Sequence, residues 1–299
     1  MPGILQIIRE AKEVAMYRGI SMLIMAVTAL TFSTTASAAD IGLIDTIALK
    51  DNAAKWVILD ARPKAAWAAA HIPGAFSFSW DNLTRINDNG VKFSSFSPQE
   101  LARILANMGI DEKTPLVVYG DADKSWGGEG YDIWLFSWLG HKGPIRLLNG
   151  GIQAWRSQNL PLVKGEEKPI APKTEYRIEL KPRYTISTEE IQQQKSSFTL
   201  VDVRSTFEWI RGKIPGAVHI PWNNFHTGKE NRPLTSNELQ TLFSKHGVDI
   251  SRPVVYYCTG GIRSAYAWLT HQLSGLPEAR NYKGGWAAWE KRGVTRSVD

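Results

Sequence analysis

Short apolar runs alternate along this chain with longer stretches that carry apolar residues at helical spacing. In the first half, the runs that are typical of buried strands are Trp56–Leu59, Leu116–Tyr119 and Arg146–Leu148. The stretches with helical spacing are Pro98–Met108, Tyr131–Leu139 and Ile152–Gln158. This alternation predicts an α/β fold in which helices flank a parallel sheet.

The same pattern returns near the C-terminus. Pro253–Tyr257 is β-branched and aromatic, and Ser264–Leu273 has helical spacing and is stopped by Gly275 and Pro277. Between them stands Cys258, the one cysteine of the chain. Ligands of open parallel sheets collect outside the carboxyl ends of the strands, so Cys258 is in a position for chemistry.

The two halves repeat each other in order. The repeated pieces are Asp60-x-Arg62 with Asp202-x-Arg204, Ile72–Ala75 with Ile214–Ala217, and Gly150–Trp155 with Gly284–Trp289. Matching Leu116–Tyr119 to the strand before Cys258 sets Asp121 over the cysteine. We therefore predict two α/β domains, residues 39–162 and 182–299, joined by a polar, proline-containing linker at 163–181.

The N-terminus carries a targeting pattern. Residues 20–32 are apolar but short for a membrane span, Arg18 precedes them, and Ala36-Ser37-Ala38 has the form of a signal-peptidase site. We predict a signal peptide at residues 1–38, cleaved after Ala38, and a periplasmic or secreted protein without a membrane segment after cleavage. An uncleaved anchor is the alternative, and a start at Met1 or at Met16 stays open.

Composition narrows the partners. Lys and Arg number 35 against 29 Asp and Glu, a net charge of +6 spread without a basic run. This argues against a nucleic-acid surface and is compatible with small anionic substrates. One cysteine and six histidines assemble no structural zinc pattern, and a lone cysteine in an exported protein favours a chemical role.

Cys258 has the setting of an activated nucleophile. Backbone N–H groups of Thr259, Gly260, Gly261, Ile262 and Arg263 would surround its sulfur at the positive end of a helix dipole, which favours a thiolate. The alternative is a cysteine used as a small buried hydrophobe. The glycines and Arg263 have no reason to flank a packing residue, so the nucleophile is the better interpretation.

Four motifs together carry a family resemblance. Asp202-Val-Arg204, Ile214–Ile220, Cys258-x-x-Gly-x-Arg263-Ser264 and Gly284-Gly-Trp286 resemble a rhodanese domain. Two such units with a cysteine only in the second resemble tandem-domain thiosulfate sulfurtransferases. The resemblance implies a first domain that lost its nucleophile, with Asp121 in place of cysteine, and helps to wall the active-site cleft.

The resemblance also implies a reaction. A sulfane sulfur would pass from thiosulfate or a similar donor to cyanide or a thiol through a Cys258 persulfide, without metal, nucleotide or flavin. Four residues separate Cys258 from Arg263, one fewer than in related phosphatase loops, so the cup fits a sulfur better than a phosphate. The alternative is a persulfide carrier that delivers sulfur to a partner protein with little turnover; the protein acceptor is unknown.

For Arg263, Thr259 and Trp126, two interpretations stay open. Arg263 either faces an anionic donor or points to solvent, and Thr259 either meets substrate or closes the turn. Ser264 is read as a helix cap, and Trp126 either roofs the cleft or packs inside. Glu208 falls where eukaryotic relatives carry an arginine, which weakens the case for a carboxylate substrate. Two further motifs are assigned to structure, the pair Asp202 and Arg204 and the side chain of His219.

Overall fold

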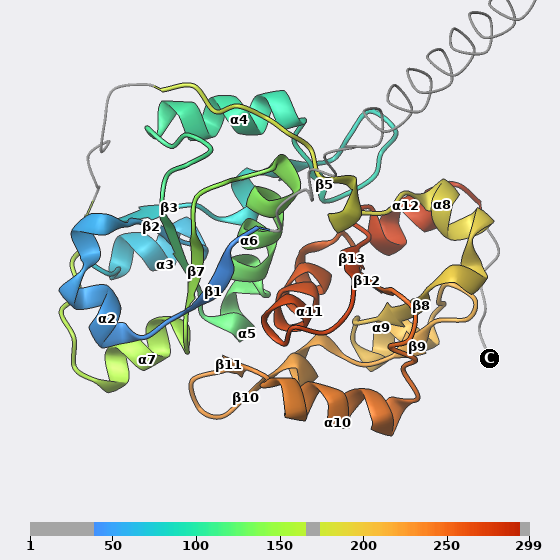
Figure 1. Ribbon diagram of the computed structural model, residues 1–299. Coiled ribbons are helices and arrows are strands. Elements are labelled where there is room, and N and C mark those ends of the chain that lie inside the picture. The colour runs from blue at the N-terminus through green and yellow to red at the C-terminus, as the bar shows by residue number, and fades with distance from the viewer. Residues whose placement is uncertain (1–38, 166–173, 294–299) are drawn as a thin grey trace, which may run out of the picture. The chain divides into compact units, whose positions relative to one another are not determined.

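The computed structural model of the protein describes residues 39–165 and 174–293. The predicted signal peptide, residues 1–38, lies outside the described residues, as does part of the predicted linker. Two parallel sheets follow each other along the chain, which confirms the predicted α/β fold (Figure 1). Of the helices described, none has the length and apolar character that a membrane span requires.

The first sheet has five parallel strands in the order β1-β7-β6-β2-β3. Its strands are β1 (Ile41–Ile44), β2 (Val57–Asp60), β3 (Ala75–Ser77), β6 (Leu116–Tyr119) and β7 (Ile145–Leu148). The central strand β6 is buried along its whole length, as expected of a parallel strand with helices on both faces. The helices of this half are α2 (Thr46–Asp51), α3 (Lys64–Ala69), α4 (Pro98–Asn107), α5 (Ala122–Ser125), α6 (Gly128–Leu139) and α7 (Gly151–Ser157).

The second sheet has four parallel strands in the order β13-β12-β8-β9. They are β8 (Thr199–Asp202), β9 (Val218–His219), β12 (Val254–Tyr257) and β13 (Ala279–Asn281). The place that β1 takes in the first sheet is reduced here to a single parallel bridge between Thr185 and Asn281. The helices are α8 (Thr188–Gln193), α9 (Thr206–Ile210), α10 (Ser236–His246), α11 (Ile262–Leu273) and α12 (Gly285–Lys291).

Each half also carries a small antiparallel pair outside its main sheet. The first is β4 (Thr84–Arg85) with β5 (Ser94–Ser95), and the second is β10 (His226–Thr227) with β11 (Arg232–Pro233). In Figure 1 the β4–β5 hairpin of the first half reaches toward α8 and α12 of the second. This contact between the halves matters for the cavities described below.

Local sequence explains where the helices begin. Four of them start with a capping box, in which a Ser or Thr and a Glu three positions later satisfy each other's backbone N–H groups; the pairs are Ser97–Glu100, Ser187–Glu190, Ser205–Glu208 and Thr235–Glu238. The helices α6 and α11 instead begin directly after a glycine in left-handed conformation, Gly127 and Gly261. Both therefore start earlier than the sequence pattern predicted, by three and two residues.

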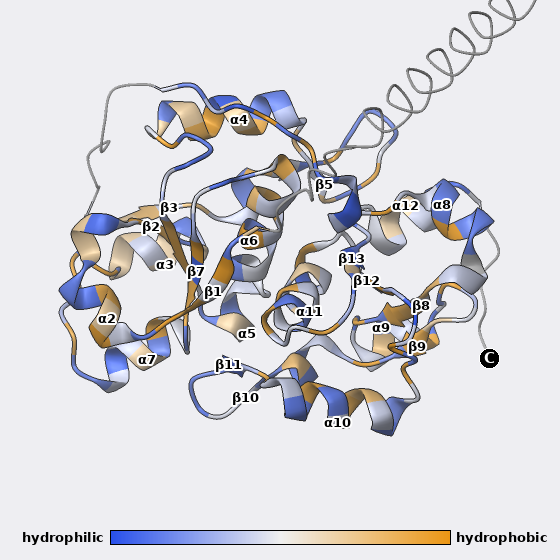
Figure 2. Cartoon of the chain, viewed as in Figure 1, coloured by the Kyte–Doolittle hydropathy of each residue, from blue (hydrophilic) through white to orange (hydrophobic). Residues whose placement is uncertain are grey.

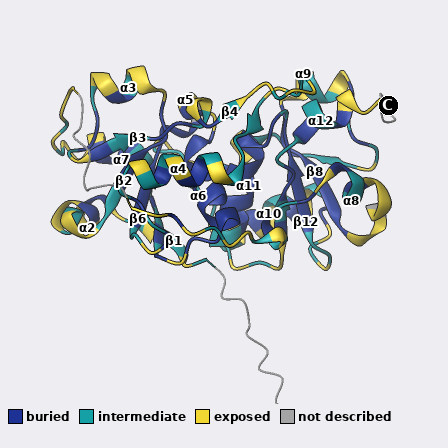
Figure 3. Ribbon diagram, turned by 90° about the horizontal axis from the view of Figure 1, so that it is seen from above, coloured by how far each residue is buried: buried dark blue, intermediate teal, exposed yellow. Residues whose placement is uncertain are grey.

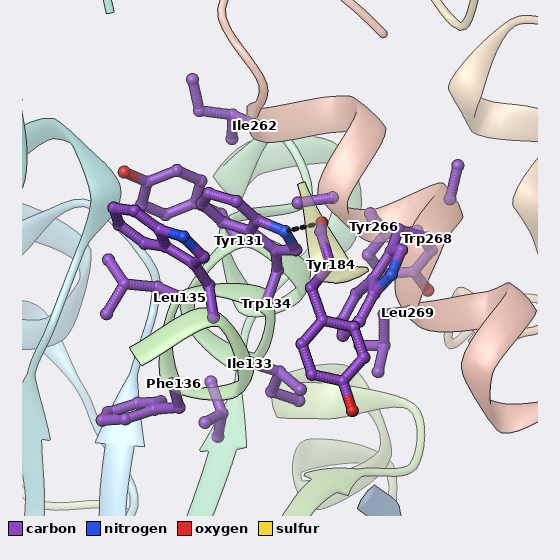
Figure 4. Packing of buried hydrophobic residues seen from close by; sticks show 14 of the residues in the cluster. Tyr131, Ile133, Trp134, Leu135, Phe136, Tyr184, Ile262, Tyr266, Trp268 and Leu269 are labelled. Atoms are coloured by element: carbon purple, nitrogen blue, oxygen red, sulfur yellow. Dashed lines mark hydrogen bonds between the residues drawn. The ribbon is translucent and has the colours of Figure 1, made fainter. Parts of the chain in front are cut away.

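The helices α6 and α11 pack against each other and join the two halves. Every residue of α6 is buried, and a Cβ on Gly130 would lie 2.4 Å from the Cα of Tyr266, so only glycine permits this approach. Aromatic side chains fill the space around the pair, and the indole N–H of Trp134 donates to the carbonyl of Tyr184 at 2.8 Å (Figure 4). One continuous core thus spans both sheets.

Polarity follows this arrangement. In Figure 2 the outer helices α4 and α10 alternate between hydrophilic and hydrophobic residues, as amphipathic helices on a sheet do. Figure 3 shows buried residues concentrated at α6 and the strands, while exposed residues lie on peripheral helices such as α2, α3 and α8. The buried centre holds the carboxyl ends of β6 and β12 close to the junction of the two halves.

Candidate active site

Cys258 follows β12 directly and lines a cavity of about 280 Å³. Its own loop, Thr259–Arg263, supplies one wall and Glu208 another. The first half supplies the aromatic side chains of Trp80, Phe93 and Trp126. The cysteine is 1% exposed and belongs to the buried core, but it also lines this cavity, whose walls include polar and aromatic side chains. The cavity gives the sulfur a space in which a second sulfur atom could stand.

The sulfur is held by two groups of its own loop and helix. The N–H of Gly261 donates to Sγ at 3.2 Å, and the hydroxyl of Ser264 lies 3.6 Å from it. The sulfur therefore has fewer N–H donors than the sequence predicted. Within the described chain, Gly261 is the one residue of this loop whose N–H hydrogen-bonds the sulfur. Gly261 is the residue directly before α11, so this N–H also lies at the positive end of the helix dipole.

The two loop glycines are required by different neighbours. A Cβ on Gly260 would lie 2.3 Å from the Cβ of Phe93, which belongs to the first half. Gly261 has φ +89°, and a Cβ there would lie 2.7 Å from the carbonyl oxygen of Lys283. The loop therefore packs closely against both the β4–β5 hairpin and the turn after β13.

Arg263 is bound by an acid and does not point to solvent. Its Nη1 and Nη2 donate to the two carboxylate oxygens of Glu208 at 2.7 and 2.8 Å, and Nη2 also donates to Oγ1 of Thr259 at 2.8 Å. The Thr259 hydroxyl donates to Glu208 at 2.6 Å. Thr259 therefore does more than close a turn, because it completes a three-residue network on the cavity wall.

Glu208 and Arg263 each stabilise the charged form of the other. Burial by itself would raise the pKa of Glu208, but hydrogen bonds from Arg263 and Thr259 hold this pKa well below its usual range. Burial would likewise lower the pKa of Arg263, and the bonds to Glu208 together with the charge of Cys258 raise it above its usual value. Arg263 is therefore a permanent cation on the wall of the cavity that Cys258 lines.

Sequence reasoning missed several members of the site: Trp80, Phe93 and Glu208 on the cavity wall, and Ser264 and Asn281 beside the cysteine loop. Ser264, expected only as a helix cap, donates to Oδ1 of Asn281 at 2.7 Å and contacts the Cys258 sulfur. Asn281 in turn donates from Nδ2 to the carbonyl of Gly261 at 3.0 Å, and all these groups are buried. Ser264 follows the loop directly, which was a usable signal, whereas nothing local marks Asn281 at the end of β13.

The structure corrects the match between Asp121 and Cys258. Strand register pairs Asp60 with Tyr119 and Asp202 with Tyr257, so the residue after each tyrosine is equivalent: Gly120 is the counterpart of Cys258. The prediction that Asp121 replaces the cysteine is wrong by one residue, and Asp121 corresponds to Thr259. The error arose because the second half has two adjacent tyrosines, and the first was matched to Tyr119.

Two backbone contacts support this register independently. The carbonyl of Gly120 accepts from the N–H of Ile152 at 3.0 Å, and the carbonyl of Cys258 accepts from that of Trp286 at 2.8 Å. Each donor follows an equivalent Gly-Gly pair. The first half thus has no nucleophile at this position because a glycine stands there.

A glutamate fills the space that a cysteine would need in the first half. A Cβ on Gly120 would lie 2.1 Å from Oε2 of Glu129 and 2.9 Å from Oγ of Ser125. Glu129 is the second residue of α6, as Arg263 is of α11. Burial raises the pKa of Glu129 to about 7. The first half therefore has an equivalent loop and helix start, but the Glu129 side chain occupies the space that a cysteine side chain would need.

The structure also locates Trp126, the pair Asp202 and Arg204, and His219. Trp126 is 53% exposed, lines the Cys258 cavity and lies with its ring centroid 5.6 Å from the Arg263 guanidinium, so it is not a core residue. Asp202 and Arg204 form a buried ion pair at 2.6 Å, in agreement with a structural role. His219 contacts the carbonyl of Arg204 at 2.9 Å and stacks on Trp209, away from the cavity lining.

Comparison with known proteins agrees with this geometry. A family model described as a rhodanese-like domain matches the chain twice, at residues 45–158 and 187–292. The chain belongs to the rhodanese family. The resemblance stated from its motifs, and the two tandem α/β domains that it implied, are thereby confirmed.

Several curated proteins are similar over most of their length. The human 3-mercaptopyruvate sulfurtransferase is 31% identical over 243 residues, covering 76% of this chain and 80% of the relative. The sulfur carrier protein TtuD of Thermus thermophilus is 31% identical over 242 residues, covering 73% and 82%. A putative thiosulfate sulfurtransferase of Haloferax volcanii is 28% identical over 269 residues, covering 82% and 89%.

Solved structures share the fold. The 3-mercaptopyruvate sulfurtransferase SseA of Escherichia coli superimposes with a TM-score of 0.73 at 21% identity, covering 82% of this chain and 98% of SseA. The anaerobic ergothioneine biosynthesis enzyme of Chlorobium limicola gives 0.67 at 24% identity, covering 79% and 62%. At these identities the likeness concerns the rhodanese fold alone.

Proposed function

We propose that this protein is a sulfurtransferase that takes a sulfane sulfur onto Cys258 and passes it to a thiophilic acceptor, with thiosulfate as the donor. One observation carries the proposal: Sγ of Cys258 lines a cavity and accepts a hydrogen bond from the N–H of Gly261, the residue directly before a twelve-residue helix. The names of the curated relatives support sulfur transfer in general.

The reaction follows from nucleophilic catalysis by a thiolate. Cys258 attacks the outer sulfur of thiosulfate, the S–S bond of the donor breaks, and sulfite leaves with the bonding electrons. The persulfide places its terminal sulfur in the cavity. An acceptor thiolate or cyanide then attacks that sulfur, and the bonding electrons return to Cys258 as the thiolate.

The protein's part is to hold charge in place before the reaction. The N–H of Gly261 and the hydroxyl of Ser264 lie against Sγ, and Arg263 stays charged beside them. The carboxylate of Glu208 pairs with Arg263, the cation of the described cavity lining, and offsets part of its positive charge toward any anionic donor. The name of the Haloferax volcanii relative, a putative thiosulfate sulfurtransferase, supports thiosulfate as the donor.

A persulfide carrier is the second candidate. The 1% exposure of Cys258 and the small cavity shield a persulfide from water, as a carrier requires. The name of the Thermus thermophilus relative, a sulfur carrier protein, favours the same interpretation. A carrier would form the persulfide but release it only to a partner protein.

Mass spectrometry and a turnover assay test both candidates. After mixing with thiosulfate, the peptide that contains Cys258 gains about 32 Da, the mass of one sulfur, as a covalent intermediate requires. With cyanide added, thiocyanate forms catalytically and Cys258→Ser abolishes it. A stable persulfide without turnover identifies a carrier. Absence of the mass gain with both thiosulfate and 3-mercaptopyruvate contradicts the proposal.

We further propose that the protein is exported and works in the periplasm or outside the cell. The apolar residues 20–32 after Arg18 and the small residues before Ala39 support this. Sequencing the N-terminus of protein recovered from cells tests it. A first residue of Ala39 is expected, and recovery of the full chain in the cytoplasm contradicts export.

A further inference from the structure

A second and larger cavity, of about 650 Å³, is lined in part by residues 282–284. The backbone of Lys283, in this segment, also lies against Gly261 of the cysteine loop. Its walls come from the β4–β5 hairpin of the first half and from α8, α12 and the turn before α12 in the second (Figure 1). This volume is in the range of cavities that hold small organic ligands. Cys258 is not among its lining residues.

The charge of this cavity is strongly unbalanced. Three basic side chains line it, Lys283, Lys291 and Arg292, against one acid, Glu189. Glu189 is already paired with Arg292. Neither lysine has an ion pair or hydrogen bond to its ammonium group within the described residues. Two ammonium groups are therefore left without an anion in the described part of the protein.

Lys283 is the more unusual of the two because it is withdrawn from solvent. Its Nζ lies 3.9 Å from the ring centroid of Trp138, an aromatic contact that replaces a carboxylate. Burial lowers the pKa of Lys283 to about 8. An anion next to this ammonium group would raise its pKa again.

Lys291 is the last residue of α12, which begins two residues after Lys283. Its Nζ lies 3.2 Å from the point where a Cβ on Gly90 would stand, so it spans from α12 to the hairpin turn. The rest of the lining includes neutral polar groups, among them Asn87, Asn89 and Ser187. Cations with amide and hydroxyl groups are the donor set that binds phosphate and carboxylate oxygens.

The cavity shares a wall with the Cys258 loop. The backbone of Lys283 lies against Gly261, close enough that a Cβ there would be 2.7 Å from its carbonyl oxygen. Two residues later the chain turns, and the N–H of Trp286 donates to the carbonyl of Cys258 at 2.8 Å. Whatever binds Lys283 therefore acts on a segment whose other side positions the nucleophile.

We propose that this cavity binds a small organic polyanion, with two or more phosphate or carboxylate groups, and that its occupancy alters the reactivity of Cys258. The site is separate from the sulfur donor's cavity and does not depend on which donor the protein uses.

Binding is measured on the whole chain by calorimetry with two probes, pyrophosphate and citrate, which distinguish phosphate from carboxylate ligands. At least one probe should bind with saturation, and Lys283→Gln combined with Lys291→Gln should weaken it about tenfold or more, because both charge-assisted contacts are lost. Lys245→Gln, which changes an exposed lysine on α10, should bind as the unaltered protein does. No saturable binding of either probe, or equal affinity in the double variant, overturns the site.

A second measurement tests whether binding in this cavity changes the reactivity of Cys258. It does not depend on sulfur transfer. The rate at which iodoacetamide alkylates Cys258 should change at least about twofold when the better probe saturates the protein, since it depends on thiolate content and access. The change should disappear in the double lysine variant, with its melting temperature recorded to exclude unfolding. An unchanged rate in the unaltered protein overturns the coupling, while the calorimetry decides the site itself.

Discussion

Glu208 and Arg263 form a two-point ion pair on the wall of the Cys258 cavity, with N–O distances of 2.7 and 2.8 Å. The same carboxylate caps α9 by accepting from the N–H and hydroxyl of Ser205. One acid thus fixes a helix start in the second domain and neutralises the cation nearest the nucleophile. The charge that a donor meets depends on this pair.

We expect Glu208→Gln to strengthen the binding of anionic donors. Glutamine keeps the capping box of α9, while the loss of one negative charge leaves Arg263 uncompensated. The KM for thiosulfate should fall about tenfold, the size of a charge-assisted contact. Steady-state kinetics check this, and Glu208→Ala serves as a control that also loses the cap. An unchanged or raised KM in Glu208→Gln would show that the pair does not govern donor binding.

Gly261→Ala should disable the cysteine loop. Its φ of +89° strains any other residue by about 1–2 kcal/mol, and the contact with Lys283 adds about 1–3 kcal/mol of overpacking. The matched control is Gly247→Ala, where φ is +67° and no atom lies within 4 Å of the added Cβ. Denaturant unfolding and persulfide yield are measured for both. Equal losses in the two variants would mean that the close approach to Lys283 is unimportant.

Ser264→Ala should slow persulfide formation about tenfold, because the O–H of Ser264 donates to Asn281, whose amide in turn holds the carbonyl of Gly261 in the cysteine loop. It also leaves Oδ1 of Asn281 buried without a donor, at about 1–3 kcal/mol of unfolding free energy. Ser264→Thr should recover both. Ser137→Ala, which removes a buried hydroxyl bonded only to a helix carbonyl in α6, is the control and should leave the rate unchanged. If alanine and threonine behave alike at position 264, the hydroxyl has no part in the reaction.

The pH dependence of stability should carry the signature of Glu129. Its pKa is raised by burial to about 7, above its value in the unfolded chain, so the folded state binds the proton more tightly. Stability from this group is complete below about pH 4.5 and is lost as the pH rises to about 7. Glu129→Gln should remove that loss and raise the unfolding free energy at pH 8 by up to about 3 kcal/mol.

Denaturant unfolding at several pH values between 4 and 8 measures this difference. Glu175→Gln, at an exposed position, is the control and should leave the pH profile unchanged. Parallel profiles for the unaltered protein and Glu129→Gln would contradict a shifted carboxyl in the first domain.

The sequence by itself determined the architecture and the position of the candidate nucleophile. Repeated motifs such as Asp60-x-Arg62 and Asp202-x-Arg204 revealed the duplication, and short apolar runs predicted the parallel strands. Cys258 was found because a strand, a glycine-rich loop and a helix follow one another within a few residues. These are local patterns, and local patterns are set by backbone preference and side-chain periodicity.

Tertiary structure alone decided what surrounds the sulfur. Glu208 meets Arg263 across 55 positions, and Phe93 comes from the other domain to lie against Gly260. Register was likewise undecided, because Tyr256 and Tyr257 are adjacent and only strand hydrogen bonds show which one matches Tyr119. Contacts between distant segments depend on how sheets and helices pack, and no short pattern in the chain encodes that packing.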